Sequence, residues 1–355
     1  MKRAAVIGAG FGGLALAIRL QSAGIATTVI EGRDRPGGRA YVWHKEGYTF
    51  DAGPTVITDP ACLAELWALS GDDIARDIEL MPVAPFYRLS WPDGTVFDYS
   101  NDDAAIDAQI AALNPADVAG YRRFLDYSAG VYAEGYEKLG AVPFLVFKSM
   151  LRAAPALARY QAWRSVYSIV SSFVANEKLR QALSFHTLLV GGNPLTTSAI
   201  YALIHKLERD GGVWFARGGT HALIEAMVRH FERLGGIVRL DDPVVEIETA
   251  GGRTVAVKTR SGWREGFDAI ASNGDVVASY GLIKDHRRGP KAVQALRRSA
   301  SRRLCLWSIS GCAGNIPRSR TIRSCSGRAT RGCSATSTAR ARWPRTPRST
   351  STTRP

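Results

Sequence analysis

The glycine spacing near the amino terminus constrains the fold of this chain more than any other feature. Gly8, Gly10 and Gly13 form a G-x-G-x-x-G pattern directly after the apolar run Ala4–Ile7. The run predicts a buried parallel strand, and Ala15–Leu20 predict a helix after the turn. In such a unit the first glycine permits a tight turn, the second lets a pyrophosphate approach the backbone, and the third lets the helix pack closely against the strand. The helix N-terminus would supply N–H groups and positive dipole to the phosphates.

A second strand and an acidic residue complete the pattern. Thr27–Ile30 predict the strand, and Glu31 stands at its end, 18 residues after Gly13. A carboxylate at that place can accept hydrogen bonds from a ribose diol, whereas it would repel a 2′-phosphate. The sequence therefore predicts an α/β fold with a Rossmann-like dinucleotide-binding domain, and it disfavours NADP as the ligand.

The segment after the second strand separates NAD from FAD. Pro36–Arg39 read P-G-G-R and lead into "GYTFDAGPTVIT", where a NAD-binding fold would usually continue into another crossover. The pattern E-x-R-x-x-x-G-G-R resembles the amine-oxidase-like flavoprotein superfamily, in which this segment approaches FAD. The resemblance implies that Gly38 and Arg39 bind the cofactor, with the guanidinium near the pyrophosphate or the flavin.

Longer segments narrow the resemblance. "VIGAGFGGLALAIRLQSAGI", "FDAGPTVITDP" and "LSFHTLLVGGNP" are similar to bacterial-type phytoene desaturases, the FAD-dependent carotenoid desaturases, and the similarity runs from about Val6 to about Arg298. "FERLGGIVRLDDPVVEIE" resembles the segment that returns to the FAD-binding domain. There Val244 matches a position whose backbone contacts adenine in the superfamily.

The resemblance also implies a division of the chain. Residues 1–60 would form the first part of the FAD-binding domain, and residues 61–205 an inserted, largely helical substrate and membrane-associating domain. Residues 206–298 would return to the FAD-binding domain. Residues 299–355 would form a disordered C-terminal tail.

The function that the resemblance implies is FAD-dependent desaturation of phytoene to more conjugated carotenes, such as lycopene or neurosporene. The flavin would accept the hydride. Phytoene or a related hydrocarbon carotenoid has no polar group, so shape and apolar burial must orient it. Three alternatives remain open: a related carotenoid oxidoreductase or isomerase, a prenyl-binding protein like the Rab GDP-dissociation inhibitors, and an inactive truncated fragment.

Candidates for catalysis are few. Arg152, in "MLRAAP", matches an arginine thought to matter in the family. Many relatives have an acidic residue where Ser149 stands, and a serine cannot serve as a carboxylate base. His186 is an alternative proton acceptor, although a single histidine on an apolar helix is more often a core residue.

We expect the chain to contact the membrane through one apolar segment at the surface rather than through a helix that spans the bilayer. The chain has no run of about 18 apolar residues. Residues 141–174 are apolar and aromatic with scattered Lys and Arg, which fits either a core helix pair or an interfacial surface. The expected location is cytoplasmic, peripheral on the inner face of the cell membrane.

The basic charge belongs to the end of the chain. The net charge is +14, but 17 of the 46 Lys and Arg residues follow Asp285, the last acidic residue, so 29 bases face all 32 acids in residues 1–285. The body therefore gives no reason to expect nucleic-acid binding. Cys305, Cys312, Cys325 and Cys333 lack the spacing of a zinc site, and no metal site is expected.

The tail resembles no family segment. Its composition changes to Arg, Ser, Thr, Ala, Gly and Pro after about Arg298. Read one base out of frame with permitted codons, "RTIRSCSGRATR" can encode "HHPILLGPRYK", and two other tail segments also yield strings like the missing family sequence. We therefore hypothesise a one-base frameshift near Ser299, which sequencing the locus across that codon would test.

Overall fold

The computed structural model describes residues 2–140, 147–284, 289–291, 293, 294 and 322–325. A four-stranded parallel sheet contains the glycine turn, with the order β13-β1-β2-β9. Its strands are β13 (Ala269–Ser272), β1 (Arg3–Ile7), β2 (Ala26–Ile30) and β9 (Ile237–Arg239). The predicted strands at Ala4–Ile7 and Thr27–Ile30 are confirmed. The carboxyl ends of β1, β2 and β13 therefore meet at one edge, which is where open α/β sheets bind ligands.

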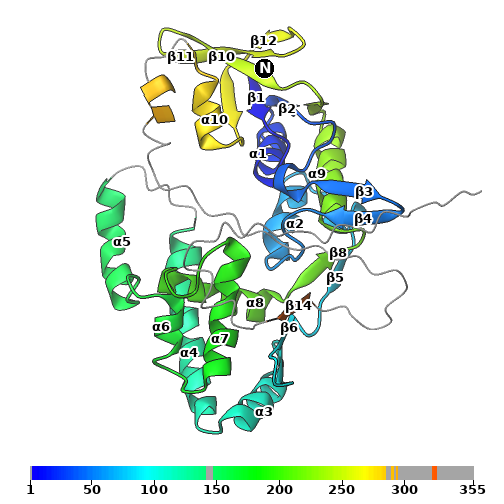
Figure 1. Cartoon of the computed structure of the whole chain (residues 1–355). Coiled ribbons are helices and arrows are strands. Elements are labelled where there is room, and N and C mark those ends of the chain that lie inside the picture. Colours follow the sequence, from blue (N-terminus) through cyan, green and yellow to red (C-terminus); the bar gives the residue numbers. More distant parts are fainter. Residues whose placement is uncertain (1, 141–146, 285–288, 292, 295–321, 326–355) are drawn as a thin grey trace, which may run out of the picture.

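The alternation of side chains along β1 and β2 gives the sheet two covered faces. Val6 and Val29 belong to a core cluster with helices α1 (Phe11–Ser22), α2 (Pro60–Ala68) and α9 (Thr220–Arg233). Figure 1 shows these three helices beside the sheet. Ala5 and Ile30 face the other way and pack with a second, three-stranded sheet. That sheet consists of β10 (Val244–Ala250), β11 (Arg253–Thr259) and β12 (Arg264–Gly266).

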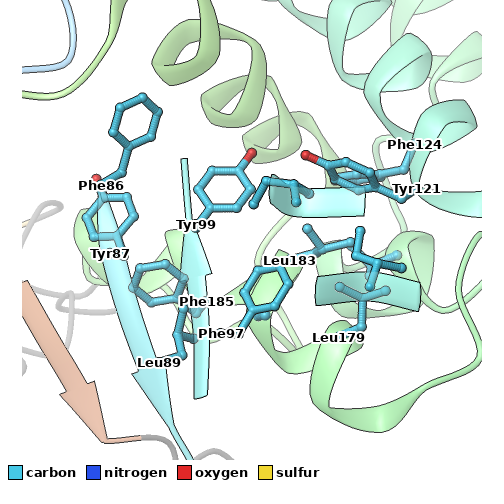
Figure 2. Close-up of a cluster of buried hydrophobic side chains, with 14 of the residues drawn as sticks. Phe86, Tyr87, Leu89, Phe97, Tyr99, Tyr121, Phe124, Leu179, Leu183 and Phe185 are labelled. Atoms are coloured by element: carbon cyan, nitrogen blue, oxygen red, sulfur yellow. The ribbon is translucent and has the colours of Figure 1, made fainter. Parts of the chain in front are cut away.

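A separate hydrophobic cluster fills the middle of the chain, from Val83 to Val213. Two antiparallel strands, β6 (Tyr87–Ser90) and β7 (Val96–Tyr99), pack against helices, and Figure 2 shows their aromatic side chains meeting those of the helices. The α-helices here are α3 (Asp103–Leu113), α4 (Asp117–Tyr132), α5 (Phe147–Arg159), α6 (Val166–Val170), α7 (Glu177–Ser184) and α8 (Leu203–Gly211). A π-helical turn (Ala133–Lys138) and the 3₁₀ helices Phe185–Val190 and Ala199–Ala202 lie between them.

Short elements join the two regions. The hairpin β3 (Val42–Lys45) and β4 (Tyr48–Asp51) follows the second glycine turn, and β5 (Leu80–Pro82) pairs with β8 (Trp214–Ala216) where the chain leaves and re-enters the cluster at Val83–Val213. Short 3₁₀ helices span Gly38–Ala40 and Ile74–Arg76, and α10 (Val276–Gly281) follows β13. Leu66 and Trp67 of α2 pack with α1 rather than with the hydrophobic cluster at Val83–Val213, called the aromatic cluster below. The first buried residue of that cluster is Val83, and the division at residues 60 and 205 stays a prediction.

One strand lies in the segment that the sequence predicts to be disordered. β14 (Ile322–Cys325) pairs in parallel with β6, with Ile322 opposite Tyr87. The prediction of disorder is therefore wrong for these four residues, because main-chain pairing along an open strand edge does not require an apolar side-chain pattern. The remainder of the predicted tail and the hypothesised frameshift near Ser299 lie outside the described residues.

Candidate functional site

The turn after β1 has the close backbone approach that the glycine pattern predicts. Gly8 has φ +97° and its N–H donates to the Ile30 carbonyl at 2.8 Å, which joins the turn to β2. A Cβ on Gly13 would lie 2.0 Å from the Gly8 carbonyl oxygen. No side chain other than hydrogen fits there, so Gly13 sets how closely α1 packs on the turn.

The start of α1 has its N–H groups free for a ligand. The helix begins at Phe11 after Gly10, and in the described residues no side chain caps it and no acidic residue lies in its first turn. The first N–H groups of a helix have no partner within the helix, and together with the dipole they attract anions. The end of α1 is therefore a suitable place for a phosphate group.

Glu31 lies next to this turn, at the end of β2, and is buried. One carboxylate oxygen accepts the N–H of Ala9 at 2.8 Å, and the other accepts the N–H of Arg33 at 3.0 Å. A carboxylate oxygen can accept more than one hydrogen bond, so both oxygens keep capacity for a ligand hydroxyl. Glu31 fixes the turn and can also accept hydrogen bonds from a ribose.

The second glycine turn lies against the first. The N–H of Gly37 donates to the Ala9 carbonyl at 2.8 Å, and a Cβ on Gly38, which has φ +56°, would lie 3.3 Å from the Cα of Gly10. Arg33 supports this turn by donating to the Gly38 carbonyl at 3.2 Å. Arg39 is exposed, and within the described ranges its guanidinium has no hydrogen-bond or ion-pair partner. Its five donors remain free for an anionic ligand.

Val244 comes to the same region from a distant part of the sequence. It packs beside Ile30 at the start of β10, where the Asp242 N–H donates to the Glu31 carbonyl at 3.1 Å. A Cβ on Gly32 would lie 2.9 Å from Pro243. The structure thus brings Gly8, Gly10, Gly13, Glu31, Gly38, Arg39 and Val244 together around one sheet edge.

Two further residues of this region were not among the sequence-predicted set. The carboxylate of Asp51 accepts the N–H groups of Thr220 at 2.9 Å and His221 at 3.4 Å, so it caps α9. The Thr220 hydroxyl donates to the Pro54 carbonyl at 2.7 Å. These contacts fix the "FDAGP" segment next to the second glycine turn. Only the "FDAGP" motif could have indicated from the sequence that Asp51 has a structural role, because its hydrogen-bond partners lie 169 and 170 residues away.

The candidates for proton transfer are not part of this assembly. Arg152 is exposed on α5, which Figure 1 draws well apart from α1. The side chain of Ser149 lies outside the described part of the chain. His186 is buried in the aromatic cluster, where its Nε2 lies 3.0 Å from Glu208 Oε2. The geometry thus agrees with a core position for His186.

Glu208 is the centre of a buried polar network in this cluster. Its other oxygen accepts the Tyr87 hydroxyl at 2.6 Å, while the contact with His186 lacks hydrogen-bond alignment. Next to it, His205 donates to the Leu183 carbonyl at 2.7 Å and accepts the Tyr99 hydroxyl at 2.8 Å. Burial lowers the pKa of His205 well below its ordinary value and raises that of Tyr87.

No helix in the described part of the chain has the length and apolar character needed to cross a bilayer. No group of three or more His, Cys, Asp or Glu side chains among the described residues could hold a metal ion.

The residues around the two glycine turns fit a dinucleotide. Gly10 has no side chain that would keep a pyrophosphate away from the backbone, and Gly13 allows α1 to start close against the turn. The free start of α1 and the unpaired Arg39 supply donors for phosphate oxygens, and Glu31 supplies an acceptor for a ribose. These groups match the adenosine and pyrophosphate part of an adenine dinucleotide.

The comparisons with known proteins agree with this geometry. The family described as "Flavin containing amine oxidoreductase" matches residues 11–305. A "Phytoene desaturase (lycopene-forming)" from Paracoccus sp. (strain N81106 / MBIC 01143) is 59% identical over 310 residues, covering 87% of this chain and 61% of the relative. A "Phytoene desaturase (neurosporene-forming)" from Cereibacter sphaeroides is 40% identical, covering 81% of this chain and 55% of the relative. The chain thus spans about three fifths of the curated relatives' length.

Solved structures give the fold. Putrescine oxidase, in its wild-type form bound to putrescine, superposes with a TM-score of 0.56 at 20% identity, covering 82% of this chain and 63% of that protein. Such a low identity supports the shared flavin amine-oxidase-like α/β fold alone.

Proposed function

The chain belongs to the flavin-containing amine oxidoreductase family, whose cofactor is FAD, and from this premise we propose that it is an FAD-dependent phytoene desaturase. The observation that carries the proposal is the 59% identity with a lycopene-forming desaturase. The lower identity of 40% with a neurosporene-forming relative favours lycopene as the product. The glycine turns support the cofactor half of the proposal.

The chain's own residues at the sheet edge would hold the cofactor. Val244 would lie beside the adenine, and Glu31 would accept hydrogen bonds from the ribose. The first N–H groups of α1 and the guanidinium of Arg39 would bind the pyrophosphate. When bound, FAD would supply the hydride acceptor for the reaction.

The finer architecture belongs to the same proposal. The largely helical region around the cluster from Val83 to Val213 would be the inserted substrate domain. A hydrocarbon without polar groups can be held only by shape and apolar surface, which aromatic and aliphatic side chains provide. Arg152 is our candidate catalytic residue there, because its charge is exposed and without a partner in the described residues.

The test uses the 355-residue chain as it exists. The purified protein is examined for flavin absorbance and is then incubated with phytoene in liposomes, and the pigments are separated by chromatography. We expect bound FAD and coloured carotenes with lycopene as the main product. Bound FAD without any turnover would contradict the proposed activity while leaving the cofactor site intact, and a folded protein without flavin would contradict both.

We also propose that the protein associates with the membrane surface, on the cytoplasmic face. Leu151, which is 58% exposed on α5, and Trp163, which is 73% exposed, place apolar surface next to the cationic Arg152 and Arg159. An apolar face bordered by basic side chains is suited to the boundary between headgroups and acyl chains. A substrate dissolved in lipid would enter from that side.

A double substitution tests the surface. Leu151→Ala with Trp163→Ala should weaken binding to vesicles of phosphatidylglycerol and phosphatidylcholine by about tenfold or more, because apolar area no longer enters the bilayer. Co-sedimentation measures the bound fraction. Val276→Ala is the matched control, since Val276 is 51% exposed on α10 in the other region of the chain. Equal binding of the double variant and the wild type would contradict the proposed surface.

A further inference from the structure

We propose that Asn273 is a further cofactor-binding residue, whose side-chain amide donates to the pyrophosphate of the bound dinucleotide. The inference rests on the proposed function, because it concerns the same sheet edge. It assigns a residue outside both glycine turns, from the end of β13 (Ala269–Ser272).

The backbone fixes Asn273 next to the first glycine turn. Its N–H donates to the Ile7 carbonyl at 2.8 Å, at the end of the pairing between β13 and β1. A Cβ built on Gly8 would lie 3.6 Å from the Asn273 carbonyl carbon. The residue therefore follows directly on the strand that neighbours β1, at the edge where the carboxyl ends of both strands meet.

The side chain lies over the turn itself. A Cβ on Gly10 would lie 3.2 Å from Asn273 Nδ2, and one on Gly12 would lie 2.6 Å from Oδ1. A Cβ on Gly13 would lie 3.3 Å from the Cβ of Asn273. The carboxamide thus covers the β13 side of the backbone that a pyrophosphate has to approach.

The carboxamide is also available to a ligand. Asn273 is exposed, and its side chain makes no hydrogen bond to another residue that the structure describes. The nearest acidic group along the chain, Asp275, is occupied because it accepts the N–H groups of Val277 and Ala278. An asparagine offers two N–H donors without a negative charge, which suits a phosphate oxygen next to the free start of α1.

A structural role alone predicts something different from a binding role. If Asn273 only packs against the glycines, its isosteric replacement by aspartate should change little or stabilise the chain, because a carboxylate near the uncapped start of α1 is favourable. If it binds the pyrophosphate, the same replacement puts a negative charge against a negative ligand and removes the donor. The two roles therefore separate in ligand affinity and not in stability.

The experiment compares Asn273→Asp with the wild type for FAD, ADP and adenosine by titration calorimetry. We expect affinity for FAD and for ADP to fall by the same factor, on the order of tenfold to a hundredfold, with relief at high salt. Adenosine, which has no phosphate, should be unaffected. The thermal midpoint of the ligand-free chain should not fall. Val276→Asp adds the same charge three residues along the chain and should leave all three affinities unchanged.

The outcomes separate this inference from the proposed function. Wild-type chain that binds neither FAD nor ADP would overturn both. Wild-type affinity for FAD that Asn273→Asp leaves within about threefold would overturn the role of Asn273 alone. Asn273→Ala gives a second check, because it removes the donor without adding charge, and we expect a smaller loss that salt does not relieve. An Asn273→Ala variant that keeps the wild-type affinity for FAD and ADP would show that only the added charge of Asn273→Asp acts, and would overturn the inference.

Discussion

Gly13→Ala is expected to abolish most of the FAD affinity and to destabilise the chain. The added methyl group would lie 2.0 Å from the Gly8 carbonyl oxygen, so α1 must move away from the turn. The atom that it meets belongs to the backbone and cannot rotate away. Overpacking of this kind costs about 1–3 kcal/mol, which corresponds to a loss of about fivefold to 150-fold in affinity where the displaced N–H groups bind the ligand.

Flavin fluorescence titration measures the affinity, and urea unfolding measures the free energy of unfolding. Gly281→Ala is the matched control, because Gly281 lies in α10 with no atom within 4 Å of its added Cβ. That change should be neutral or slightly stabilising, since alanine is the better helix former. Unchanged FAD affinity in Gly13→Ala would show that the phosphates do not bind the N–H groups at the start of α1.

Glu208→Ala is expected to lower the free energy of unfolding by about 2–3 kcal/mol, the upper part of the range for leaving a buried polar group without its hydrogen-bond partner. Glu208 is fully buried. Its removal takes away the hydrogen-bond acceptor of the Tyr87 hydroxyl and the carboxylate next to the His186 ring, both of which lie inside an apolar cluster. Glu208→Gln keeps an oxygen acceptor for Tyr87 and should cost less. The comparison therefore isolates the contribution of the acceptor oxygen.

The measurement is urea unfolding of each variant, with the slope checked for two-state behaviour. Glu46→Ala is the surface control, because the Glu46 side chain is 79% exposed and the ion pair it loses is a long one, with 3.9 Å between Glu46 Oε1 and Lys45 Nζ. We expect no measurable change there. A Glu208→Ala variant within about 1 kcal/mol of the wild type would mean that water or a side-chain rearrangement satisfies Tyr87 and His186.

The sequence predicted the cofactor half of the site because its signal is local. Gly8, Gly10, Gly13 and Glu31 lie within one strand–turn–helix–strand unit, so spacing alone fixes their neighbours. The helix start at Phe11 and the end of β2 at Ile30 follow from the same pattern. In that unit the local preference and the tertiary packing agree.

Contacts over long sequence separations were beyond such reasoning. Nothing in the spacing of "FDAGP" indicates that Asp51 caps a helix that starts at Thr220. Likewise, Glu208 looks like a surface residue of an amphipathic helix until β6 brings Tyr87 to it, 121 residues away in the sequence. The pairing of Ile322–Cys325 with β6 was not predicted, because it rests on main-chain groups that composition does not report.

The pairing of β1 with β13 has a consequence for how the protein is made on the ribosome. Arg3 donates its N–H to Asp268, 265 residues later, and β13, the strand that begins there, completes one side of β1. The β1–α1–β2 unit therefore leaves the ribosome early but waits for most of the chain before its sheet edge closes. Such non-local pairing folds slowly and exposes apolar strands in the meantime. Flavin supply during synthesis should thus matter late, once β13 has emerged.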